Sequence, residues 1–273
     1  MSAGTFGSWM RDVSVQVDET VYDLKTCDIE FEIKGGSDAD QNGAEIVLWN
    51  LSPAMISAMS ILSPVRVTAG YAGYTGTLFE GYITQIDGER DGADTSTKIF
   101  CSDASLLLYR SKTFSIDVKE SEALSDVVKR VFSLCNIPVG MVDDTGILFE
   151  SEAAFFGTGI QILDELVNIV KGRGYDFRCY TESGMGYFVD VNTVTTSNVF
   201  EISSNTGLLS VERVTDSDEN ICGKVVILLN WGIKTDTWLK IDAGFLNGYY
   251  KAVNYKHTLS GDTYQTEIEV SGV

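Results

Sequence analysis

The residues best suited to chemistry in this chain are few and poorly spaced for catalysis. A single histidine, His257, lies near a hairpin turn at Gly261, and a Ser-His-Asp triad would have to use it. No Gly-x-Ser-x-Gly elbow and no phosphate-binding loop occurs, and one histidine excludes a His-Glu-x-x-His zinc motif. We interpret His257 as an exposed or hydrogen-bonded turn histidine, and predict no catalytic, cofactor-binding or metal-ligating residue.

Carboxylates are abundant, but their arrangement carries little chemical information. Asp38, Asp40 and Asn42 resemble the start of a calcium loop, yet position twelve counted from Asp38 is Trp49 instead of a glutamate. We interpret this segment as a polar turn, and the acidic pair at 143–144 as solvated. Because the chain has 39 Asp and Glu residues, pairs arise by chance, and residue types alone leave a two-carboxylate glycosidase open.

The cysteines and the apolar segments indicate a reduced protein outside the membrane. The cysteines are odd in number, widely scattered and without a Cys-x-x-Cys pair, which predicts buried thiols in a cytoplasm. They are Cys27, Cys101, Cys135, Cys179 and Cys222. The first residues lack a basic-then-apolar secretion signal, and no apolar run nears the roughly 20 residues that span a bilayer. We therefore expect no membrane insertion.

The net charge of -19 limits the possible partners. Nucleic-acid phosphates and anionic membranes are bound through clustered Lys and Arg, so this balance opposes both. Solubility is the favoured explanation of the charge. The alternative is an acidic channel lining that nucleic acid passes without binding.

Most of the chain must position its side chains on strands. Residues 10–112 have the period of two that marks half-buried strands, as in the alternating valines of 13–17. A polar turn region is expected at 35–43. One short helix is expected at 54–62, with Ser52 as its cap.

The middle of the chain, residues 113–197, has the pattern of a small α/β unit of strand, two helices and hairpin. An apolar helical face runs through 124–132, with Ser121 as the candidate N-cap. Thr158 and Gln161 fit a capping box for the second helix. The rest of the chain returns to strands, which are expected at 224–229, 238–241, 249–255 and 264–270.

A weak repeat links the two β-rich parts. The matched blocks, given as first and second copy, are 43–50 and 223–230, 66–71 and 240–245, 79–82 and 246–249, and 94–95 and 262–263. Glycine-rich strands can align by chance, but blocks in the same order favour an internal duplication, with length differences confined to loops. Three copies of a duplicated chain would present six similar domains around one axis.

These residues resemble the hub proteins of phage tail baseplates and related contractile injection systems. The resemblance covers almost the whole chain and is carried by structural patterns. The segments are 46–52 (IVLWNLS), 65–71 (VRVTAGY), 76–83 (GTLFEGYI), 204–209 (SNTGLL), 225–230 (VVILLN), 247–250 (NGYY) and 255–263 (YKHTLSGDT).

The resemblance implies a mostly β, α+β fold, with tail-tube-like β-barrel domains at 1–112 and 198–273 flanking an α/β domain at 113–197. It implies a homotrimer that joins a hexameric tail tube to a trimeric spike among other baseplate proteins. DNA would pass through the lumen without specific binding. Such a protein belongs to the virion tail baseplate, is assembled in the host cytoplasm, and has no cofactor or catalytic residue.

Two other functions stay open at this point. A carbohydrate-binding tail or surface module would use clustered exposed aromatic side chains. Phe, Trp and Tyr together make up 11% of the residues. A glycosidase would need a cleft with two carboxylates. Neither alternative requires two copies of a β domain around an α/β insert, so the repeat favours the structural hub.

Overall fold

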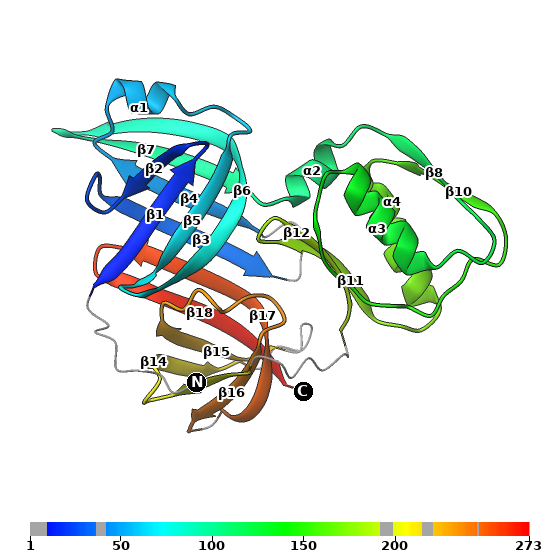
Figure 1. Cartoon of the computed structure of the whole chain (residues 1–273). Coiled ribbons are helices and arrows are strands. Elements are labelled where there is room, and N and C mark those ends of the chain that lie inside the picture. Colours follow the sequence, from blue (N-terminus) through cyan, green and yellow to red (C-terminus); the bar gives the residue numbers. More distant parts are fainter. Residues whose placement is uncertain (1–9, 37–41, 192–198, 215–220, 245, 273) are drawn as a thin grey trace. The chain divides into compact units, whose positions relative to one another are not determined.

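The computed structural model describes residues 10–36, 42–191, 199–214, 221–244 and 246–272 (Figure 1). Strands dominate and helices are short and few, which confirms the predicted mostly β, α+β class. Among the described residues, no helix is long and apolar enough to cross a membrane. The predicted polar turn at Asp38 and Asp40 lies outside the described residues.

The chain divides into two compact units. The β unit contains the described residues of 10–36, 42–102 and 199–272, and the insert unit contains those of 103–191. The β unit therefore combines strands from both ends of the chain. We call its two parts the first repeat, up to residue 102, and the second repeat, from residue 199.

The first repeat consists of seven strands and one short helix. They are β1 (Arg11–Val17), β2 (Thr20–Asp23), β3 (Ile29–Gly36), β4 (Gly43–Trp49), α1 (Pro53–Ser57), β5 (Pro64–Tyr71), β6 (Tyr74–Asp91) and β7 (Asp94–Ser102). The second repeat contains β13 (Val199–Ser203), β14 (Leu208–Arg213), β15 (Ile221–Leu228), β16 (Trp238–Ala243), β17 (Leu246–Ser260) and β18 (Thr263–Gly272).

The two repeats have the same strand order. In the first, hydrogen-bonded neighbours run β3-β4-β7-β6-β5, and in the second they run β14-β15-β18-β17-β16. Two clusters of buried apolar side chains lie in this unit, one centred on Ile46 and Ile99 of the first repeat and one on Val225 and Ile268 of the second. The first cluster also includes Leu229, Leu259 and Tyr264 of the second repeat. The duplication predicted from the sequence is thus present in the topology.

The agreement extends to the pairing register. Asp91 lies opposite Asp94 at the end of the β6–β7 hairpin, as Ser260 lies opposite Thr263 in β17–β18. Both ladders contain one register shift at the same distance from the turn. It falls between Ile83 and Gln85 in the first repeat and between Ala252 and Asn254 in the second. β-bulges tend to be conserved within protein families. A bulge at the same position in both repeats therefore supports duplication.

The register corrects the sequence alignment of the repeat. The inward-facing Ile46 lies opposite Ile99, and its structural counterpart Val225 lies opposite Ile268. The predicted match of 43–50 to 223–230 is therefore one residue out. A one-residue slip exchanges the two faces of a strand. Both segments are rich in apolar residues, so either alignment looks acceptable in the sequence. The block at 66–71 is in register, because Val65 and Leu239 face the equivalent Gly81 and Tyr250.

The insert unit is a small α/β unit with one core. Its elements are α2 (Ser105–Arg110), β8 (Phe114–Val118), α3 (Leu124–Leu134), β9 (Val139–Val142), β10 (Ala153–Gly157), α4 (Gly159–Gly172), β11 (Phe177–Glu182) and β12 (Met185–Asp190). β8 pairs with β10, and β12 lies between β11 and β9. The apolar faces of α3 and α4 are buried in the same core, as their periodicity predicts.

Local predictions of helix ends have mixed outcomes. Thr158 caps α4, and its backbone N–H donates to Gln161 Oε1 at 2.9 Å, as the capping box predicts. The Ser121 cap is wrong. Ala123 is the N-cap of α3, and Ser121 has a φ of 65°, with its N–H donating to the Phe149 carbonyl. A carbonyl from elsewhere in the unit satisfies the first helical N–H in place of a cap, since Leu124 N donates to Ile147 O.

Two further boundaries differ from the sequence prediction. Ser52 caps α1 as expected, but this helix ends at Ser57 instead of residue 62. The backbone then turns back, and Leu62 donates its N–H to Ile83 of β6. The predicted turn at 35–43 is also wrong at its start, because β3 continues through Gly36.

Candidate functional site: the joint between the repeats

The two repeats are joined by direct pairing of β3 with β17, which we call the internal joint. The strands are antiparallel, and the paired residues run from Phe31 opposite Leu259 to Gly36 opposite Asn254. This pairing merges the strands of both repeats into one sheet (Figure 1). The joint is therefore a continuous backbone ladder in addition to a contact of side chains.

Glycine in β3 is required by the side chains of β17. Gly35 lies opposite Tyr255, whose ring passes over the glycine, and a Cβ at Gly35 would lie only 2.2 Å from the ring. Tyr255 is buried, so its ring would have to shift against its packed neighbours to admit a Cβ. At the next position, a Cβ on Gly36 would collide with the Asn254 side chain. The glycine pair is thus a packing requirement of the joint, which explains why β3 continues where the sequence suggested a turn.

Side chains further along both repeats strengthen the joint. The Arg11 guanidinium donates to the carbonyls of Gly261 and Asp262, at 2.7 and 2.6 Å, and lies over the Tyr264 ring. The Tyr264 hydroxyl donates to the Gly70 carbonyl at 2.7 Å and accepts from the Gly70 N–H at 2.8 Å. Burial raises the pKa of the Tyr264 hydroxyl, so it stays protonated and able to donate.

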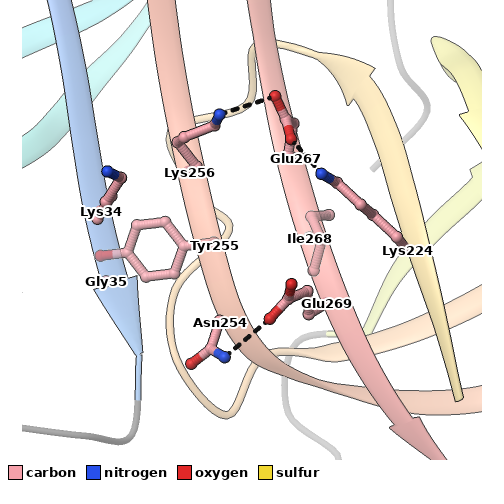
Figure 2. A pocket seen from close by; sticks show the side chains of 9 residues that line it. All are labelled: Lys34, Gly35, Lys224, Asn254, Tyr255, Lys256, Glu267, Ile268 and Glu269. Carbon is pink, nitrogen blue, oxygen red and sulfur yellow. Dashed lines mark hydrogen bonds and ion pairs between the residues drawn. The ribbon is translucent and has the colours of Figure 1, made fainter. Parts of the chain in front are cut away.

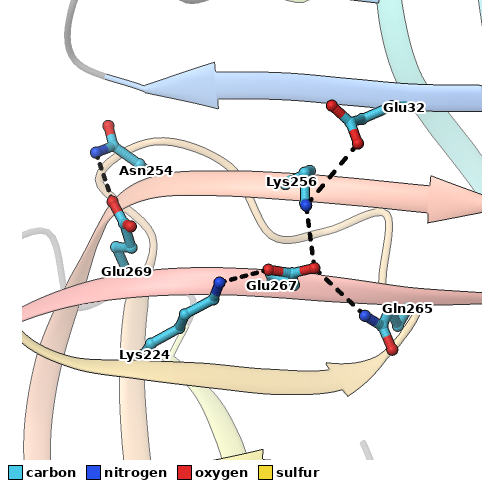
Figure 3. A network of polar contacts seen from close by, with 7 residues as sticks. All are labelled: Glu32, Lys224, Asn254, Lys256, Gln265, Glu267 and Glu269. Atoms are coloured by element: carbon cyan, nitrogen blue, oxygen red, sulfur yellow. Dashed lines mark hydrogen bonds and ion pairs between the residues drawn. The ribbon is translucent and has the colours of Figure 1, made fainter. Parts of the chain in front are cut away.

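One face of the joined sheet is polar and half exposed, and we call it the polar face. Lys256 of β17 pairs with Glu267 of β18 at 3.2 Å and with Glu32 of β3 at 3.8 Å (Figure 3). Lys224 of β15 also pairs with Glu267, at 2.7 Å. Partial burial opposes ionisation of Glu267, but the hydrogen bonds from these two lysines hold its pKa below the usual range. The hydrogen bond to Glu267 likewise raises the pKa of Lys224.

Every lysine that the joined strands present on this face has a carboxylate partner. Lys34 pairs with Glu32 at 2.7 Å, and Lys98 pairs with Glu45 at 3.1 Å. The polar face also contains Glu269, which accepts from Asn254 Nδ2 at 2.9 Å. A phosphate approaching this face would meet lysines that are already paired with glutamates.

A shallow pocket of about 210 Å³ lies on the polar face. Figure 2 shows its lining by the paired lysines and glutamates around Tyr255 and Gly35. Its floor is the joint itself, and its charged groups are engaged with each other. The pocket is open and small, and its lysines and Glu267 are already paired, which is unlike a typical ligand site.

The residues singled out for chemistry do not come together. His257 is fully buried on β17, where its Nδ1 lies 2.9 Å from Thr266 Oγ1. The hydrogen-bonded interpretation is right, but an exposed turn position is wrong, because pairing with β3 covers this part of β17. Burial, followed by the nearby positive charge of Lys234, lowers the pKa of His257 well below 6.5. A ring held neutral in the core is suited to packing more than to proton transfer.

The remaining candidates are also structural. The acidic pair in the insert unit is held in its loop, since Asp143 accepts from the Asp190 N–H and Asp144 from the Gly146 N–H. The large exposed aromatics in the described chain are scattered over separate elements and form no sugar-binding cluster; they are Tyr74, Tyr109, Phe156, Tyr175 and Tyr249. Within the described residues, no group of three or more His, Cys, Asp or Glu side chains is placed to hold a metal ion. The cysteines are free thiols, and burial raises the pKa of Cys101 to about 12.

Solved structures with a similar fold include tail proteins. A tail protein from Neisseria meningitidis MC58 superposes with a TM-score of 0.68 at 10% identity, covering 97% of each chain. The chain shares its fold with phage tail proteins. The 43 kDa tail protein of prophage MuSo2 from Shewanella oneidensis gives a TM-score of 0.67 at 11% identity, covering 95% of this chain and 96% of that one.

The same fold occurs outside phages. A component of the type VI secretion system of E. coli, itself similar to phage T4 tail proteins, gives a TM-score of 0.61 at 9% identity. It is covered over 76% of its length, against 95% of this chain. No family model and no curated protein sequence matches the chain. The resemblance to tail hub proteins drawn from the sequence is thus confirmed at the level of fold.

Proposed function

We propose that this chain is a structural hub subunit of a phage-type tail or related injection machine. Three copies form a ring of pseudo-six-fold symmetry, which joins a hexameric tail tube on one side to a trimeric spike on the other. The observation that carries this proposal is the matched register of the two repeats, including the bulge at an equivalent place. Two equivalent domains per chain allow three chains to meet a six-fold partner.

In this proposal each repeat is a tail-tube-like β-barrel domain. The division follows that expected from the sequence, with domains at 1–112 and 198–273 and an α/β domain at 113–197, although the compact units place 103–112 with the insert. Apolar clusters centred on different repeats support two β domains. The insert domain lies between the two repeats along the chain.

The polar face is proposed to line the lumen. Its lysines are held by Glu32, Glu45 and Glu267, and the chain as a whole has a net charge of -19. DNA would therefore be repelled weakly and evenly along the wall, and would slide through without specific binding. The role is geometric and non-enzymatic, and its place is the virion tail baseplate, assembled in the host cytoplasm beside other baseplate proteins.

Mass in solution tests the ring. Light scattering behind size exclusion should give three times the 29.9 kDa of one chain across a concentration series. A monomer at every concentration, with and without a candidate tube or spike protein, would refute the ring. Saturable binding in a sugar screen, with a monomeric mass, would favour the carbohydrate-binding module instead.

A further inference from the structure

The β unit has several strand edges without a partner in the described part of the chain, and two of them take equivalent places in the two repeats. The outer part of β6, from Gln85 to Asp91, pairs with β7 on one side only. β14 pairs with β15 on one side only. Residues on both edges are exposed, including Asp87, Glu89 and Glu212. Open edges of this kind are templates for pairing with another chain, and proteins normally cover them.

The repeat identifies what these edges correspond to. The outer part of β6 is the counterpart of the part of β17 that pairs with β3, because both follow the shared bulge. β14 is the counterpart of β3, because Val211 faces Val225 as Phe31 faces the equivalent Ile46. The two open edges are therefore the same two surfaces that meet in the internal joint.

We propose that the two edges pair with each other between copies of the chain. β6 of one protomer joins β14 of the next, antiparallel and in the register of the internal joint. This inference rests on the proposed ring and specifies its protomer contact. Glu89 then lies opposite Glu212 of the next copy, as Thr258 lies opposite Glu32 inside one chain.

The exposure pattern fits such a contact. Gly88 is the counterpart of His257, yet a Cβ at Gly88 would meet nothing within 4 Å, whereas His257 is fully buried. In the proposed register Arg213 of the next copy lies opposite Gly88, so a long side chain faces open space. The internal joint uses the same device, with the Tyr255 ring over Gly35.

We call the proposed β6–β14 contact between chains the external joint. Internal and external joints then alternate around the axis. Each chain contributes one internal joint, one β6 edge and one β14 edge, so the contact between copies is head-to-tail. A head-to-tail contact closes into a ring when its rotation divides a full turn. Equivalent joints within and between chains give six matching steps from three chains, in which the β6 and β14 edges are all paired.

The charges make the external joint the weaker of the two. In the internal joint, Lys256 lies between Glu32 and Glu267, whereas its counterpart on β6 is Asp87. The proposed register places Glu89 opposite Glu212 and Asp87 diagonally beside it, and like charges on paired strands oppose association. We expect Glu89→Gln to tighten association about two- to fivefold, and added salt to act in the same direction.

Disulfide trapping tests the register. A chain with Glu89→Cys and Glu212→Cys should form covalent dimers and trimers on mild oxidation. The matched control pairs Glu89→Cys with Leu209→Cys, an exposed position three residues away, roughly 10 Å along β14. A second control, Lys34→Cys with Lys256→Cys, should cross-link within one chain and leave the mass unchanged. The unsubstituted chain gives the background from its own cysteines.

The outcomes separate this inference from the ring itself. Intermolecular cross-linking in the Glu89/Glu212 pair and not in the Glu89/Leu209 pair supports the proposed joint. A trimeric mass with equal or absent cross-linking in both pairs overturns the β6–β14 register and leaves the ring standing. A monomeric mass with no intermolecular cross-link overturns both.

Discussion

The outer parts of β6 and β17 have the same backbone register but opposite surroundings. β17 presents Tyr255, His257 and Leu259 to the interior, and all are buried because β3 pairs alongside. At the equivalent places β6 has an isoleucine, Gly88 and Arg90, and this edge is open. The backbone frame was kept after duplication, while the side chains diverged according to whether the neighbouring strand is in the same chain.

The largest difference in stability is expected between substitutions of Gly35, in the internal joint, and of Gly88, on the open edge of β6. Gly35→Ala forces a Cβ into the buried Tyr255 ring and should lower the free energy of unfolding by about 2–3 kcal/mol. Gly88→Ala, with open space around it, should change that free energy by less than about 0.5 kcal/mol. Urea unfolding at fixed, low protein concentration measures both. Equal effects would show that the internal joint is not tightly packed.

Tyr264 gives the next largest effect. Tyr264→Phe removes the hydroxyl that bonds both backbone groups of Gly70 and should cost about 2 kcal/mol of unfolding free energy. Its counterpart in the first repeat is Thr95. The backbone N–H of Thr95, and not its side chain, makes the hydrogen bond there, by donating to Asn50 Oδ1. Thr95→Val should therefore cost under about 0.5 kcal/mol. Thermal unfolding of both variants provides the comparison, and a silent Tyr264→Phe would contradict it.

The buried histidine predicts a pH dependence that its counterpart Gly88 cannot have. The folded chain keeps His257 neutral because its pKa is lowered, whereas the unfolded chain takes up a proton below about pH 6.5. His257 should thus leave the free energy of unfolding unchanged above this pH and lower it by about 1–1.5 kcal/mol on going to pH 5.5.

The single histidine makes this effect easy to assign. His257→Asn should flatten the dependence between pH 7.5 and 5.5, measured by urea unfolding across that range. An unchanged slope in the variant would mean that His257 is accessible to protons in the folded chain.

The smallest effect is expected on the polar face. Lys256→Gln removes both ion pairs of this half-buried lysine and should cost about 0.5–1 kcal/mol, with the loss reduced in high salt. Asp87→Asn, at the equivalent place on the open edge, should be neutral in the isolated chain. Unfolding in low and high salt compares them, and a salt-independent loss for Lys256→Gln would point to packing of its alkyl stem instead.

The sequence predicted what is local and missed what depends on distant pairing. Strand positions, the α4 capping box and the duplication followed from short patterns. The burial of His257 and the continuation of β3 through Gly36 depend on pairing between segments about 220 residues apart, which no local pattern encodes. Ser121 failed as a cap because a carbonyl from Ile147 takes over the first helical N–H. A glycine pair facing an aromatic strand was the one available signal for the joint.

Electron microscopy of the purified assembly, viewed along its axis, tests the central claim most directly. If the two repeats are equivalent and the internal joint is repeated between chains, the inner wall should show six similar densities from three chains. An inner wall with only three-fold character, or no closed ring at all, would contradict the equivalence of the two repeats in the assembly.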